Sequence, residues 1–342
     1  MGEKTREKQL SILSILRGSD IPLSSSRISE ELAAFGQHVS ERTVRFYLKR
    51  MDEDGLTQSI GKRGRHITQK GLSELDSSRI MERAAFMSAK IDQMTYRMDF
   101  DITDRSGTVV INITLVEPGQ LLERVGMICK VFEKGYAMGQ LVALLEPGES
   151  IGHITVPEGM VGVGTACSIT LNGVLLKYGI PTNSRFGGLL ELQGGKPTRF
   201  VEIITYDGTS IDPLEVFIRS GMTNYIGAIE TGNGRIGASF REFPAESREL
   251  VEKLAHKLEN VGLGGFVRIG RISQTLLEIP VSEGRVGAIV IGGLNPVSIL
   301  EETGLRAYSR ALAGLIDYNR LFRYEELESR IRTYISGHTL LR

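Results

Sequence analysis

Cysteine and tryptophan are scarce in this chain of 342 residues, which contains two cysteines and no tryptophan. Two cysteines without a CxxC spacing rule out a disulfide framework and indicate a reducing compartment. No apolar run approaches the roughly 18 residues that cross a bilayer, and the N-terminus has no signal-peptide pattern. We therefore expect a soluble, cytoplasmic protein without a membrane-spanning segment.

Groups that could bind a metal ion or carry out catalysis are also missing from the sequence. The five histidines show no ligand spacing. No Ser/His/Asp set, carboxylate pair or P-loop stands out either. We expect no metal, no cofactor and no catalytic residues, and therefore a protein that is not an enzyme.

The chain has no net charge, because 41 basic residues balance 41 acidic ones. The charges are unevenly distributed, since residues 1–70 hold 13 Lys and Arg against 9 Asp and Glu. A basic end on a slightly acidic body suits a protein that binds a polyanion with one end only.

The first part of the chain has the pattern of a winged helix-turn-helix domain. Helical segments cover residues 4–18 and 24–36, and a third helix begins after Ser40. A hairpin follows, with glycines and three cations in its turn at residues 61–65. Three short helices and a hairpin within about 70 residues make up such a domain.

The third helix has an apolar stripe formed by Val44, Leu48 and Met51 at positions i, i+4 and i+7. Ser40 is a good N-cap, and Gly55 stands where a glycine ends a helix. The alternative to a recognition helix and wing is a solvated charged helix beside a solvated turn. If the segment is a recognition helix and wing, the helix faces the major groove of DNA, and the turn contacts phosphates or the minor groove. We expect DNA contacts from Arg42, Thr43, Arg45 and Lys49 in the helix, and from Lys62, Arg63 and Arg65 in the turn.

The body of the chain, residues 100–325, contains an internal repeat at an offset of 125. At this offset Gly159 matches Gly284, and Arg185 matches Arg310. Each unit should run strand, helix, strand, Gly-rich strand, short helix, strand. The fold class is therefore mixed α/β, with two units packed around a pseudo-twofold axis.

The apolar pattern between Thr68 and Met98 predicts a helix that packs on the wing domain, links it to the body or pairs with a copy of itself. The expected organisation is a winged helix at 1–76, a linker helix at 77–99, a body at 100–325 with repeats at about 100–223 and 224–325, and a helical tail at 326–342.

The Gly-rich stretch from Val161 to Leu171 has the pattern of a buried strand whose glycines let a ligand or another backbone segment come close. Asn172 would cap a short helix ending at Gly179, and a helix N-terminus beside hydroxyl groups offers donors to an anion. Arg185 could supply a guanidinium for a carboxylate. These features predict a site for a small carboxylate or phosphate; the alternative is tight packing with hydroxyls that satisfy the backbone. The candidate ligand-binding residues are Thr165, Cys167, Ser168, Asn172 and Arg185.

One GxGxxG motif, from Gly232 to Gly237, matches the dinucleotide-binding fingerprint in its glycines. That fingerprint must follow a strand and open a helix. Here the flanking segments 224–229 and 238–240 are both strand-like, so we predict a hairpin turn.

The run GTACSITLNGVLLKYGIPTNSRFGG, preceded by a winged helix with a basic wing, resembles the nitrogen repressor family of methanogenic archaea. The resemblance covers nearly the whole chain, and the DNA-binding domain resembles the ribonuclease R type. It implies a dimeric repressor of nitrogen-assimilation genes that binds a palindromic DNA operator and is released by 2-oxoglutarate, a small dicarboxylate. By this match the sensing role falls on Cys167, Ser168, Asn172 and Arg185, and the DNA role on the Ser40 helix and the wing.

Some members of that family carry two regulatory domains, whereas this chain has one. The arrangement resembles a split form in which a second polypeptide supplies a further regulatory domain. Three other interpretations stay open: a regulator of another small anion, an enzyme acting on a small acid, and a partner that only bridges DNA to another regulator.

Overall fold

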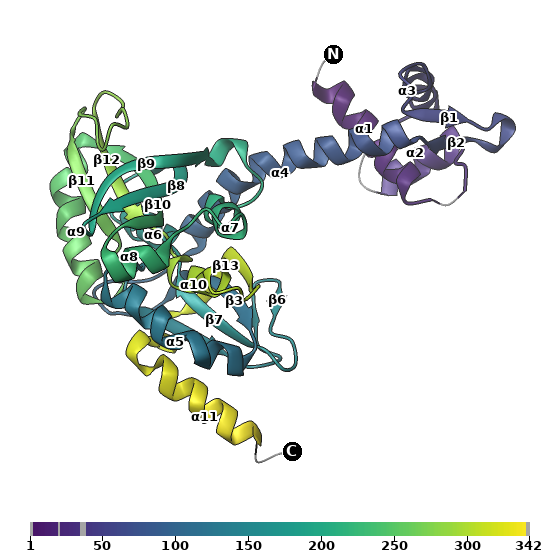
Figure 1. Cartoon of the computed structure of the whole chain (residues 1–342). Helices are drawn as coiled ribbons and strands as arrows, with labels where there is room; N and C mark the ends of the chain where they lie inside the picture. Colours follow the sequence, from purple (N-terminus) through teal and green to yellow (C-terminus); the bar gives the residue numbers. More distant parts are fainter. Residues whose placement is uncertain (1–2, 20, 35–38, 340–342) are drawn as a thin grey trace. The chain divides into compact units, whose positions relative to one another are not determined.

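The computed structural model describes residues 3–19, 21–34 and 39–339 (Figure 1). The chain forms two compact units, Met1–Ala84 and Ala85–Arg342, and helix α4 (Gln69–Arg97) contributes to both. The first unit is a winged-helix domain and the second is a mixed α/β domain. The fold class predicted from the sequence is therefore confirmed.

The described part of the N-terminal unit combines helices with a small antiparallel hairpin. Its core includes Leu13, Ile28, Val44 and Leu48, which come from successive helices. The elements are α1 (Glu3–Arg17), α2 (Ser25–Ala34), α3 (Glu41–Glu53), β1 (Thr57–Ser59), the 3-10 turn η1 (Gly61–Arg63), β2 (Arg65–Ile67) and the start of α4.

The chemistry of the flanking residues explains where α3 begins and ends. Ser40 Oγ accepts a hydrogen bond from the Thr43 N–H at 3.3 Å, and Gly55 follows the helix with a φ of 72°. Both predicted caps are confirmed. Gly64 has a φ of 115°, and a Cβ there would lie 2.3 Å from the Leu23 carbonyl oxygen. Only glycine lets the hairpin approach the chain before α2 so closely.

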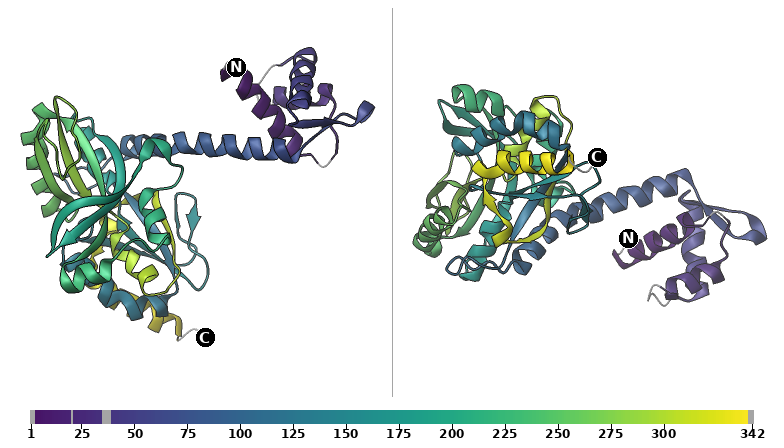
Figure 2. Two further views of the ribbon diagram at one scale, coloured as in Figure 1. Left: turned by 45° about the horizontal axis from the view of Figure 1, so that its top comes forward. Right: turned by 90° about the horizontal axis from the view of Figure 1, so that it is seen from below.

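The described part of the second unit contains two five-stranded antiparallel sheets and a small hairpin, and Figure 2 shows them from two further sides. The first sheet has the order β13 (Tyr308–Asp317), β3 (Thr108–Val116), β7 (Val161–Ala166), β4 (Leu141–Leu145) and β14 (Phe322–Arg323). The second has the order β11 (Phe266–Ile272), β12 (Arg285–Ile291), β10 (Gly234–Pro244), β8 (Asn183–Gln193) and β9 (Lys196–Thr205). The hairpin is β5 (Ser150–Ile151) with β6 (Ile154–Thr155).

Helices pack on both sheets, and α10 and α11 both pack against α5 (Figure 1). The α-helices are α5 (Pro118–Glu133), α6 (Ile169–Lys177), α7 (Pro213–Arg219), α8 (Tyr225–Thr231), α9 (Arg248–Asn260), α10 (Asn295–Glu302) and α11 (Leu327–Thr339). The 3-10 turns are η2 (Tyr206–Gly208), η3 (Ala245–Ser247), η4 (Tyr318–Arg320) and η5 (Tyr324–Glu326).

The two repeats exchange their last strands. The first repeat runs β3, α5, β4, β7, α6, β8, and the second runs β10, α9, β11, β12, α10, β13. β8 pairs with β10 of the second repeat, and β13 pairs with β3 of the first. Each sheet therefore contains strands from both repeats, so neither half has a complete sheet by itself.

The prediction of a strand at 224–229 and a hairpin turn at the glycine motif is wrong. Asn224 caps α8 by accepting the Gly227 N–H at 2.9 Å, and Gly232 ends this helix with a φ of 77°. The cap and the left-handed glycine favour a helix over the strand-like composition. The glycine motif therefore joins a helix to β10.

Asn172 does not cap a helix as expected. Helix α6 begins at Ile169, and the Cys167 carbonyl already accepts the Thr170 N–H at 3.0 Å. Asn172 therefore lies within α6, where its side chain is buried.

Candidate functional site

Helix α3 turns a basic side to the solvent. Val44, Leu48 and Met51 are fully buried, as predicted. The side chains on the opposite side are exposed, and they are Arg42, Arg45, Phe46, Lys49 and Arg50. This arrangement leaves a cationic helix face of the kind that can enter the major groove of DNA.

Two of the helix residues expected to contact DNA already have partners. Thr43 is half-buried, and its Oγ1 lies 2.9 Å from Ser40 Oγ, so it belongs to the helix cap. Arg45 forms an ion pair with Glu41 one turn earlier, and the hydrogen bond from Arg45 lowers the pKa of Glu41. Because exposed ion pairs are weak, Arg45 can exchange Glu41 for a DNA group.

Arg65 holds the hairpin in place, in contrast to the DNA contact expected for it. Its Nε donates to Asp52 Oδ2 at 2.8 Å, and the Thr57 hydroxyl donates to the same carboxylate at 2.6 Å. Asp52 lies in α3, so this ion pair fixes the wing against the helix. Arg63 is exposed, whereas the side chain of Lys62 lies outside the described part of the chain.

In the second unit, Ser168 and Asn172 converge on Arg241, a residue that the sequence analysis did not single out. Arg241 is only 1% exposed. Its Nη1 donates to the Ser168 carbonyl oxygen at 2.8 Å and to Asn172 Oδ1, and its Nη2 donates to the Ser168 hydroxyl at 2.7 Å. Within the described residues no carboxylate pairs with this guanidinium, and its Nε lacks a hydrogen-bond partner.

Arg241 lies in the interior because both faces of β10 are covered there. The pairing of β10 with β12 keeps a regular register through Arg241, and the register shift against β8 leaves Arg185 of β8 as the unpaired residue. Burial lowers the pKa of Arg241, but a guanidinium stays charged in a protein. A buried charge without an opposite charge is costly, so an anion would be stabilised strongly at this position. The available sequence signal was the pair Arg241 and Glu242 within a run of small and apolar residues.

Thr165 and Cys167 are buried near the same end of β7. Thr165 Oγ1 accepts a hydrogen bond from Asn112 Nδ2 at 3.3 Å. Burial raises the pKa of the Cys167 thiol to about 11, so this thiol is protonated at neutral pH. The Cys167 thiol therefore adjoins the Arg241 cluster as a neutral group, whereas Thr165 binds Asn112.

Arg185, expected to bind a ligand carboxylate, instead binds a carboxylate of the protein itself. Its Nη1 donates to Glu242 Oε1 at 2.7 Å and to the Pro280 carbonyl oxygen at 2.6 Å. Its guanidinium also stacks 5.6 Å from the Phe240 ring centroid. Glu242 is 1% exposed on its side chain, so this contact neutralises a buried charge.

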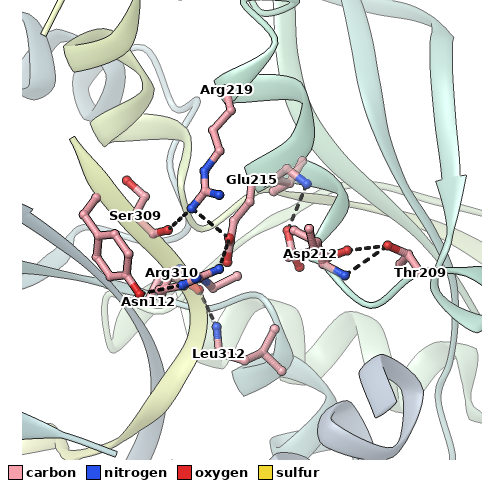
Figure 3. A network of polar contacts seen from close by, with 12 residues as sticks. Asn112, Thr209, Asp212, Glu215, Arg219, Ser309, Arg310 and Leu312 are labelled. Carbon is pink, nitrogen blue, oxygen red and sulfur yellow. Dashed lines mark hydrogen bonds and ion pairs between the residues drawn. The ribbon is translucent and has the colours of Figure 1, made fainter. Parts of the chain in front are cut away.

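Arg310, which matches Arg185 in the repeat, binds Glu215 in a similar way (Figure 3). Glu215 accepts hydrogen bonds from Arg310 Nη1 at 3.1 Å, from Arg219 Nη2 at 3.4 Å and from the Ala311 N–H at 2.7 Å. Three donors on one carboxylate hold α7 against the exchanged strand β13.

Asp212 lies at the start of α7 beside this network (Figure 3). Its Oδ1 accepts the Leu214 N–H at 2.9 Å and so caps the helix. Burial, and then repulsion by Glu215, raise the pKa of Asp212 to about 7. Asp212 is therefore a buried carboxyl group that gains or loses a proton near neutral pH.

Comparison with known proteins identifies the relatives of this chain. Residues 84–323 match the family of NrpR regulatory domains NRD1 and 2, and residues 10–75 match the ribonuclease R winged-helix domain. The chain is 33% identical over 321 residues to the global nitrogen regulator NrpRI of Methanosarcina mazei, which covers 94% of this chain and 99% of that protein. The chain belongs to the NrpR family.

Two further NrpR relatives are longer. Identity is 32% over 310 residues with the regulator of Methanococcus maripaludis and 34% over 291 residues with that of Methanocaldococcus jannaschii. These matches cover 91% and 85% of this chain but 54% and 50% of those proteins, so it spans about half their length. A nitrogen repressor-like protein from Methanococcus jannaschii has a related structure, with a TM-score of 0.58 and 26% identity over 69% of this chain and 97% of that one.

The described residues of this NrpR-family chain include no helix with the length and apolar character needed to cross a membrane. In the same residues, no three His, Cys, Asp or Glu side chains gather where they could hold a metal ion.

The raised pKa of Asp212 predicts a specific pH dependence of stability. The folded protein keeps the Asp212 proton between about pH 4 and pH 7, whereas the unfolded chain loses it, so stability falls as pH rises through this range. Asp212→Asn removes this contribution and keeps an oxygen that can cap α7. The unfolding free energy of the wild type should fall by about 2 kcal/mol relative to the variant between pH 5 and pH 8 in urea titrations. A difference that stays constant over this range would contradict the assignment.

Proposed function

We propose that this chain is a DNA-binding repressor of nitrogen-assimilation genes that acts as a cytoplasmic homodimer on a palindromic operator and is released by 2-oxoglutarate. The observation that carries the proposal is the exposed basic face of α3 in a winged-helix domain of an NrpR-family chain. The named relatives are nitrogen regulators rather than enzymes, which favours regulation over catalysis.

The DNA contacts divide between the helix and the wing. Arg42, Arg45 and Lys49 reach base edges in the major groove, where bidentate arginine contacts read guanine. Arg63 at the wing tip contacts phosphates, together with Lys62, and these contacts fix the position of the domain on the duplex. Arg65 and Asp52 keep the wing at a fixed angle to α3, which sets the spacing between the two sets of contacts.

The effector enters the cluster around Arg241. A carboxylate of 2-oxoglutarate would neutralise the buried guanidinium, and the Ser168 hydroxyl and Asn172 amide would exchange their bonds to Arg241 for bonds to the ligand. The neutral thiol of Cys167 borders the same place. Since Arg241 and Ser168 come from different repeats, a ligand between them favours one arrangement of the repeats over another.

A homodimer matches a palindromic operator because the two half-sites of the DNA are related by the same twofold symmetry as the two protomers. The chain spans about half of two longer relatives. We infer that a second polypeptide with a further regulatory domain can join the dimer.

Substitutions in the helix and wing should separate base recognition from phosphate contact. Arg63→Ala should weaken binding to all duplexes about equally and reduce the salt dependence by about one charge, because it removes a phosphate contact. Arg45→Ala should relax specificity by about 1–3 kcal/mol at one base pair. Fluorescence anisotropy on a duplex selected from a random pool, and on random DNA, measures both effects. Equal losses on both duplexes for both variants would refute the division of roles.

Calorimetry should detect 2-oxoglutarate binding that depends on Arg241. Arg241→Lys keeps the charge but loses the forked donor geometry, so affinity should fall about tenfold or more. Arg268→Lys, which changes an exposed arginine of β11, is the matched control and should bind like the wild type. Succinate, malate and phosphate complete the panel. If the chain binds phosphate but not 2-oxoglutarate, the effector is a different anion. If Arg241→Lys and Arg268→Lys bind 2-oxoglutarate with equal affinity, the site is not at Arg241.

A further inference from the structure

A cavity of about 220 Å³ lies in the second unit, and its lining does not include Arg241, Ser168 or Asn172. It is enclosed by the end of α4, the β5–β6 hairpin, the start of α7 and strand β13. Its charged and polar lining is Lys90, His153, Ser210, Asp212, Glu215, Tyr308 and Arg310. Sites for drug-sized ligands measure about 300–1,000 Å³, so this cavity suits a smaller molecule.

Asp212 and Lys90 both line this cavity without forming an ion pair with each other. Asp212 is 6% exposed, and its carboxylate accepts a backbone hydrogen bond from Leu214. Within the described residues, neither Asp212 nor Lys90 forms an ion pair, although both line the cavity. They are therefore too far apart to pair directly, and a ligand between them could satisfy both.

The other carboxylate in the cavity is already neutralised. Glu215 is held by Arg310 and Arg219 and by the backbone of Ala311 (Figure 3). Asp212 is thus the carboxylate that a cationic ligand group would find available. A dicarboxylate would instead place negative charge beside Asp212 and Glu215, which repels it.

Nitrogen-bearing side chains line the same cavity. Lys90 and the exposed His153 come from α4 and the β5–β6 hairpin, and Arg310 binds its partners among the described residues through Nη1 and Nε. Its Nη2 remains as a further donor for a carboxylate. The lining therefore offers an acceptor for an ammonium group and donors for a carboxylate.

We propose that this cavity binds a free α-amino acid, with its ammonium group at Asp212 and its carboxylate at Lys90 and Arg310. A zwitterion supplies both missing charges in one small molecule and leaves no net charge in the site. The proposal is independent of the 2-oxoglutarate site, because the two sites share no residue.

Calorimetric titration of the full chain with glycine, L-alanine, L-glutamate and L-glutamine tests the proposal. At least one of them should bind saturably. Asp212→Asn, which keeps the helix cap, and Lys90→Met should each weaken that binding about tenfold, the value of one charged hydrogen bond. Lys196→Met, on the exposed strand β9, is the control and should leave binding unchanged. Circular dichroism melting curves establish that each variant is folded.

Ammonium chloride and 2-oxoglutarate distinguish the recognised chemistry. Neither should displace the amino acid at equal concentration, since ammonium lacks the carboxylate and 2-oxoglutarate lacks the ammonium group. Displacement by ammonium alone would show that the carboxylate is not recognised and would overturn the proposal. Absence of saturable heat with all four amino acids, or full affinity in both cavity variants, would overturn it as well. None of these failures would affect 2-oxoglutarate binding at Arg241.

Discussion

The positive charge of Arg241 in the protein interior is the constraint on which the regulatory unit depends. Its partners within the described residues are a carbonyl, a hydroxyl and an amide, and none carries a negative charge. Uncharged partners recover only part of the free energy that water gives to a guanidinium. An anion bound beside Arg241 would therefore stabilise the unit, and it would favour the arrangement that leaves room for it.

Strand exchange explains how stabilisation at Arg241 can affect both repeats of the unit. Arg241 lies on β10 of the second repeat, while Ser168 and Asn172 flank or belong to α6 of the first. At the register shifts of the exchanged strands, Arg185 and Arg310 bind Glu242 and Glu215. These pairs tie each exchanged strand to a buried carboxylate, so the repeats respond together rather than separately.

The sequence was sufficient for patterns that depend on local chemistry. The stripe of Val44, Leu48 and Met51, the two caps of α3, and the element order of both repeats follow from periodicity and from short-range hydrogen bonds. It was insufficient where distant segments meet. The partner of Arg65 is 13 residues away and that of Arg185 is 57 residues away, so neither ion pair is visible in a local pattern. Arg241 was missed because its partners Ser168 and Asn172 lie 73 and 69 residues away in the chain.

The central claim is that a small dicarboxylate weakens the hold of the basic helix face on DNA. A gel-shift titration of the full chain, with and without 2-oxoglutarate, tests it most directly. The account predicts that 2-oxoglutarate raises the protein concentration needed for half-saturation of the DNA. Unchanged half-saturation at a 2-oxoglutarate concentration that calorimetry shows to be saturating would contradict it.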